Sequence, residues 1–156
     1  MKLFLLGIAA AALQAQTLQI IPAPSPVEGV AIFQIIFVSS AAAPVVALQW
    51  KLLLPEGVTV APNDLVLGSA AESAGKSLIC SAAPPPSKTG IAKVNVYSCI
   101  LAGGQKPVPR GTVALARCTL RVALREAAVR LREVIGVSAD LKRTDLPEAE
   151  ATLRTK

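Results

Sequence analysis

The chain has 156 residues, close to the length of one domain, and its composition excludes several classes of protein. Hydrophobic residues make up 53% of the sequence and aromatic residues only 3%, so a core must be built from aliphatic side chains. There is no histidine, which excludes Ser-His-Asp and Cys-His catalytic arrangements. The formal net charge of +6 suggests either acidic partners or simple solubility. Valine-rich segments separated by proline and glycine favour an all-β sandwich or barrel.

Residues 1–15 are typical of a secretory signal peptide. Lys2 precedes a short apolar run that ends in small residues, with Ala15 as the last residue before cleavage. The run is too short to cross a bilayer of about 30 Å as a helix. We therefore expect a signal peptide over 1–15 and a single domain over 16–156. The mature protein is expected to be exported, to the outside or periplasm of a bacterium, with no transmembrane segment and no nucleic-acid partner.

Segments of alternating or β-branched residues recur along the rest of the chain. The predicted strands cover residues 17–21, 30–39, 46–54, 58–60, 78–81, 91–100, 112–125, 125–134 and 151–154. In the third of them, Leu48, Trp50, Leu52 and Leu54 fall on one face. This phase predicts that Trp50 is buried, and not on the surface where it could stack on a sugar.

The remaining stretches are predicted as turns and loops, with one ambiguous segment. Residues 63–76 are loop-like, and a turn is expected at 145–147. Segment 125–134 has a helix-favouring composition, yet Val129 and Leu131 alternate with Arg130 and Arg132 as in a strand. We predict a strand there, because no N-cap precedes the segment and its surroundings are β.

Three cysteines are an odd number in a chain expected to be exported, where disulfides persist. Cys80 and Cys99 lie at similar distances on either side of a proline-rich loop, which predicts a cross-strand disulfide. Closing a loop of about 20 residues stabilises the folded state by roughly 3 kcal/mol. Cys118 shares its parity with inward residues and is predicted to be a buried thiol. Cys99 shares its parity with the outward residues Lys93, Asn95 and Tyr97, so the alternative pair, Cys99–Cys118, requires a mismatch of faces or a bulge.

Charged side chains do not form a recognisable catalytic or metal site. The ten acidic residues lie in turns or among charged neighbours, so no carboxylate pair for glycoside hydrolysis is indicated. Without histidine or a CxxC motif, no metal or cofactor is expected. Arg117, Arg121 and Arg125 share an outward parity and are followed by Arg130 and Arg132. They form either a basic stripe for an acidic partner or a solvated face that prevents edge pairing.

Two segments resemble cohesin domains. Residues 47–55 (ALQWKLLLP) are similar to the third-strand motif, an alternating strand that ends in a proline turn. Residues 90–122 follow the cohesin order of strand, loop, turn and strand, with Pro109, Arg110, Gly111, Val113, Leu115, Ala116, Leu120 and Val122 at the corresponding positions. Arg110 stands where aspartate is common, and Leu120 stands where phenylalanine is common.

The resemblance implies a jelly-roll sandwich of about nine antiparallel strands, related to bacterial carbohydrate-binding modules. Cohesins hold the dockerin modules of secreted polysaccharide-degrading enzymes on the outer face of one sheet. Carried over to this chain, it implies a non-catalytic binding module for a dockerin-like protein, or alternatively for polysaccharide itself. The outward positions of the two matching strands become the candidate contact residues, Gln49, Lys51, Lys93, Asn95 and Tyr97.

Overall fold

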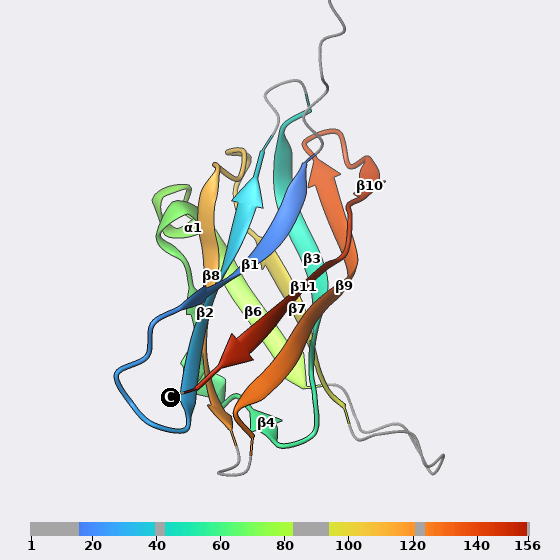
Figure 1. Cartoon of the computed structure of the whole chain (residues 1–156). Helices are drawn as coiled ribbons and strands as arrows, with labels where there is room; N and C mark the ends of the chain where they lie inside the picture. The colour runs from blue at the N-terminus through green and yellow to red at the C-terminus, as the bar shows by residue number, and fades with distance from the viewer. Residues whose placement is uncertain (1–15, 40–42, 83–93, 121–123, 156) are drawn as a thin grey trace, which may run out of the picture.

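The computed structural model describes residues 16–39, 43–82, 94–120 and 124–155, and the predicted signal peptide lies outside these ranges. Two antiparallel sheets face each other, as the ribbon in Figure 1 shows. The first sheet, sheet A, contains β1 (Thr17–Ala23), β2 (Val30–Val38), β8 (Gly111–Leu120), β4 (Val58–Thr59) and β5 (Leu65–Leu67). The all-β sandwich predicted from the alternation of side chains is confirmed.

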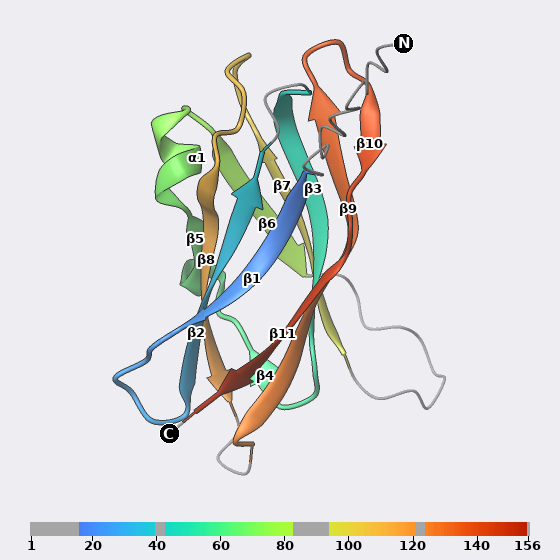
Figure 2. The ribbon, with the colours of Figure 1, turned by 45° about the horizontal axis from the view of Figure 1, so that its top comes forward.

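Sheet B is the second layer, and Figure 2 shows its strands β6 and β7 behind β2 and β8. It contains β10 (Arg143–Asp145), β9 (Glu126–Ser138), β3 (Val45–Leu54), β7 (Asn95–Ala102) and β6 (Ser77–Ala82), with β11 (Ala149–Arg154) also paired to β9. The described residues thus form eleven strands, and the excess over about nine comes from short strands such as β5 and β10.

The ambiguous segment 125–134 is a strand, as predicted, because it forms most of β9. Val129 and Leu131 are fully buried on its inner face, so tertiary burial outweighs the helix propensity of its Glu, Ala and Arg residues. The predicted loop at 63–76 is wrong in part. It contains η1 (Pro62–Asp64), β5 and the short helix α1 (Ser69–Ser73), because it crosses β8 closely enough to pair with it.

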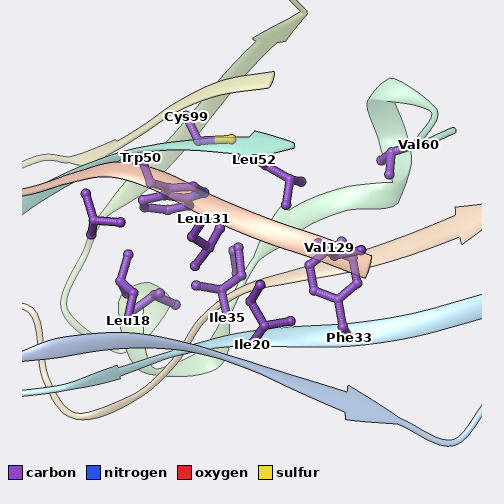
Figure 3. Close-up of a cluster of buried hydrophobic side chains, with 14 of the residues drawn as sticks. Leu18, Ile20, Phe33, Ile35, Trp50, Leu52, Val60, Cys99, Val129 and Leu131 are labelled. Carbon is purple, nitrogen blue, oxygen red and sulfur yellow. The ribbon is translucent and has the colours of Figure 1, made fainter. Parts of the chain in front are cut away.

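The core lies between the two sheets and is almost entirely aliphatic. Trp50 is fully buried, as predicted, and Figure 3 shows it beside Cys99 and above Leu131 and Leu18. Within the described residues its indole N–H has no hydrogen-bond partner, so packing alone holds the ring. Phe33 and Ile35 approach from β2 in the opposite sheet. Burying side chains of this size contributes about 1.5–3 kcal/mol each.

Candidate functional site

The outer face of sheet B carries an exposed aliphatic pair. Ile79 of β6 and Ile100 of β7 are cross-strand partners, and they are 70% and 49% exposed. A cross-strand pair on one face lies about 5 Å apart between Cβ atoms, so the two side chains form one apolar surface. Contiguous exposed aliphatic surface indicates an interaction site more often than single exposed side chains scattered over the surface do.

The strand register extends this pair into a row across the sheet. Ile100 is opposite Gln49 on β3, and Gln49 is opposite Ile135 on β9. We call Ile79, Ile100, Gln49 and Ile135 the isoleucine row. Each of β6, β7, β3 and β9 contributes one outward side chain, so the row crosses these four strands of sheet B.

A second row lies two residues further along the strands and is polar. Its members, in strand order, are Ser81, Ser98, Lys51 and Arg132, and we call it the cationic row. Lys51 Nζ lies 2.7 Å from a carboxylate oxygen of Glu133. Arg132 Nη1 lies 2.6 Å from a carboxylate oxygen of Glu148. Because exposed ion pairs contribute only about 0–1 kcal/mol each, an acidic partner could replace either carboxylate at little cost.

A β-bulge in β9 positions Glu133 on this face. Gln49 pairs with Ile135 while Lys51 pairs with Arg132, so two residues of β9 lie opposite Trp50 alone. Glu133 has φ of 48°, the left-handed conformation that this extra residue requires. The bulge turns the Glu133 carboxylate outward beside Lys51 and returns Val134 to the core, where it is 2% exposed.

The Cys80–Cys99 disulfide is present, as predicted, and it joins the two strands of the exposed pair. Cys80 and Cys99 are direct cross-strand partners with Cα atoms 4.1 Å apart. Cys118 is free and buried, also as predicted. Burial, and secondarily the negative charge of Asp64, raises the pKa of the Cys118 thiol to about 12.

The predicted phase of β7 is wrong. Cys99 was expected on the outward face, but it is fully buried opposite Trp50. Tyr97 and Asn95 therefore share the inner side of the strand. The Tyr97 hydroxyl donates to the carbonyl of Val60 at 3.2 Å, and the Asn95 amide donates to the carbonyl of Val58 at 2.9 Å. These side chains fix β7 to the segment that follows β3.

The misassigned phase has a physical cause. Both parities of residues 94–101 contain apolar side chains, so alternation alone does not choose a face. The signal that decides is pairing with β3, because Cys99 lies opposite Trp50 and Leu101 lies opposite Leu48. Ile79 and Ile100 were missed as candidate contacts for the same reason.

Of the predicted contact residues, Gln49 and Lys51 do lie on the outer face, in the isoleucine row and the cationic row. Lys93 lies outside the described residues. Asn95 and Tyr97 do not share that face, so the orientation predicted for them is wrong. The partner-binding role of all five stays a prediction.

The expected arginine stripe does not form as one surface. Arg117 is exposed on β8 in sheet A, and β8 ends at Leu120. Arg125 precedes β9 in the other sheet, while Arg121 lies outside the described residues. Arg130 pairs with Glu150 at 2.7 Å, and Arg132 pairs with Glu148, so these two belong to the charged part of sheet B.

Metal and membrane sites were sought in the part of the chain that the structure describes. There, His, Cys, Asp and Glu side chains do not gather in groups of three or more that could hold a metal ion. None of the helices in these ranges is long and apolar enough to cross a membrane.

Comparisons with known proteins give solved structures alone, since no family model and no curated protein sequence matches the chain. The fold is similar to a non-cellulosomal cohesin from the archaeon Archaeoglobus fulgidus, with 13% identity, 90% of each chain covered and a TM-score of 0.59. It is similar to a cohesin module of a family 33 glycoside hydrolase from Clostridium perfringens, with 9% identity, coverage of 90% and 97%, and a TM-score of 0.61.

A third similar structure is the sixth cohesin of scaffoldin B from Acetivibrio cellulolyticus, solved in complex with a Cel5 dockerin mutant. It has 9% identity and a TM-score of 0.61, with 87% of this chain and 96% of that chain covered. The agreement spans nearly the whole length of each module, while identity is far below the level at which function transfers. The chain therefore has the cohesin fold, the β-sandwich that its sequence motifs indicated.

Proposed function

We propose that this chain is an exported, non-catalytic module that binds a partner protein of the dockerin type on the outer face of sheet B. The observation that carries the proposal is the exposed Ile79–Ile100 pair at one end of the isoleucine row. A partner that covered it would remove aliphatic surface from water, while the cationic row beside it would meet acidic groups. Such an apolar patch with a charged margin is typical of protein interfaces.

Two further observations support the proposal. Several of the similar structures are cohesins solved in complex with dockerins, which makes this the partner class to test first. Export is supported by the signal-peptide pattern of residues 1–15 and by the disulfide, which persists in oxidising compartments. The role that follows is attachment of a partner within a polysaccharide-degrading or cell-surface assembly.

Direct binding of polysaccharide is the less favoured function. Flat sugar-binding faces rely on exposed aromatic rings, and Tyr97 is the aromatic residue among the predicted contact residues. Its ring instead packs against the core and its hydroxyl bonds the Val60 carbonyl. Retardation in gels that contain polysaccharide is the measurement that would revive this alternative.

The test is binding to a panel of purified dockerin modules by isothermal titration calorimetry. Ile100→Asp places a charge in the isoleucine row, and we expect it to weaken binding by about tenfold or more. Ile21→Asp is the matched control, because Ile21 is 41% exposed on the outer face of sheet A. Equal weakening by both variants would contradict the assignment of the face. Absence of binding to any dockerin, with retardation by polysaccharide, would replace the proposed function by the alternative.

A further inference from the structure

Strand β6 is the least anchored part of the proposed docking face. Within the described ranges it pairs only with β7, at the end of sheet B. Four of its six residues are exposed, and only Leu78 and Cys80 pack against the core. Edge strands of this kind open locally at a small fraction of the global free energy of unfolding.

The disulfide is the one covalent constraint on this strand. Cys80 and Cys99 are opposite each other, and the next pair along the ladder is Ile79–Ile100 on the outer face. A slip of one residue would turn Ile79 inward and Cys80 outward, because side chains alternate between faces. The disulfide forbids that slip, so it fixes the register that presents Ile79 beside Ile100.

The two cysteines differ in exposure. Cys99 is fully buried opposite Trp50, whereas Cys80 is partly exposed. A dithiol reductant can therefore reach the bond from the Cys80 side. Its thiolate forms a bond to Cys80 Sγ, and Cys99 leaves as a thiolate that takes up a proton. The second thiol of the reductant then displaces Cys80, which leaves both cysteines as thiols and the reductant as a disulfide.

We infer that the Cys80–Cys99 bond controls assembly of the docking face, so that the chain becomes competent to bind its partner only after oxidation. The inference rests on the proposed function for the identity of the face. The rest of the sandwich does not depend on β6, because the core is formed mainly by β2, β3, β8 and β9. The reduced chain keeps that core and loses the ordered end of the isoleucine row. A disulfide-bearing oxidant outside the reducing cytosol completes the face by taking up two electrons and two protons.

Hydrogen exchange of the whole chain, read by mass spectrometry, tests this without any partner. The comparison is between the oxidised protein, the same protein reduced by a phosphine, and Cys80→Ala, which keeps the Cys99 side chain in the core. In both altered forms we expect the amides of β6 to exchange about tenfold faster or more, while those of β3, β8 and β9 change less than twofold. The phosphine should cause no further change in Cys80→Ala.

Two results would overturn the inference. One is unchanged protection of β6 in the reduced chain. The other is equal loss of protection in all strands, which would make the bond a global stabiliser only. Dockerin titration of the oxidised and reduced chains is the second arm. If the amides of β6 exchange faster in the reduced chain and both forms bind dockerin equally, control by oxidation is refuted while the proposed function stands. If the oxidised chain binds no dockerin, the proposed function fails, and the exchange result still decides what the disulfide does to β6.

Discussion

Cys118 lies on the inner face of β8 between Ala116 and Leu120, and its thiol is fully buried. Removal from water penalises the thiolate, which raises the pKa of Cys118 from an ordinary value of 9.0 to about 12. The protonated form is therefore strongly favoured in the folded state. In the unfolded chain the same thiol ionises near its ordinary value, so the two states bind protons differently above that pH.

This difference predicts a loss of stability at high pH. Below the pKa of the Cys118 thiol in the unfolded chain, the thiol is protonated in both states and the free energy of unfolding does not depend on its ionisation. Above that pH, ionisation stabilises the unfolded state, so the free energy of unfolding falls until the pH reaches the pKa of the thiol in the folded state. Between pH 8 and 10.5 we expect the wild-type chain to lose about 2 kcal/mol more than Cys118→Ala. Urea unfolding of both proteins at the two pH values measures it. Lys76, whose pKa is lowered by burial, is present in both and cancels. Equal losses would contradict the prediction.

At the scale of residues, the sequence predicts burial well where one parity is strongly apolar. Trp50 and Cys118 follow that pattern, and both are in the core. It fails at Tyr97 and Cys99, because Val96 and Ile100 supply an equally apolar set of the other parity. Pairing with β3, which places Cys99 opposite Trp50, decides which face of β7 points to the core.

In strand β9, a bulge changes which residues face the core. Its buried residues are odd-numbered up to Leu131 and even-numbered from Val134 onward, and the bulge at Glu133 makes the change. On the side away from β3, β11 pairs with the first part of β9 and β10 with the last part. Leu146 N donates to the Val134 carbonyl at 2.8 Å in the gap between them. The bulge at Glu133 thus lies between the part of β9 that pairs with β11 and the part that pairs with β10.

The conformation of Glu133 gives a prediction for this element. A φ of 48° is unfavourable for a β-branched side chain and costs glycine nothing. We expect Glu133→Val to destabilise the fold by about 1–2 kcal/mol and Glu133→Gly to change stability by less than about 0.5 kcal/mol. Both remove the exposed ion pair with Lys51, so the difference between them isolates the backbone. Denaturant unfolding measures it, and equal effects would show that φ is unimportant there.

The strand type of β9 could be predicted from sequence, whereas its bulge could not. Alternation of Val129 and Leu131 with arginines gives the strand. The adjacent polar pair Arg132 and Glu133 is the sole local sign of an extra residue, and such a pair also occurs in unbroken strands. Similarly, the apolar patch 65–67 gave no indication that it would pair with β8.

For the whole molecule, the pairing of distant strands is the dominant feature. β3 (Val45–Leu54) lies between β7 and β9, and β9 begins at Glu126. The sandwich class could be predicted because alternation is local. The pairing order could not be predicted, because the sequence of a ten-residue strand does not indicate which distant strand it pairs with. The resemblance to cohesins implied a jelly-roll sandwich of about nine strands, and the pairing order comes from the structure.

Such topology predicts slow folding. The chain between β3 and β9 must close into a loop before these strands can make contact. The entropy cost of closure is therefore incurred before the contacts stabilise the fold. With the disulfide intact, we expect relaxation over about milliseconds to seconds in stopped-flow circular dichroism. Relaxation in microseconds would indicate that local elements such as β6 and β7 govern the barrier instead.

The position of Trp50 has one more consequence. It is the only tryptophan in the chain, and its ring lies beside Cys99, whose sulfur is half of the disulfide. A disulfide accepts an electron from an excited indole and quenches its emission, whereas a thiol at the same place quenches less. Light emitted by this single ring therefore reports, in the purified protein and without any label, whether a given molecule has closed its sulfur bridge.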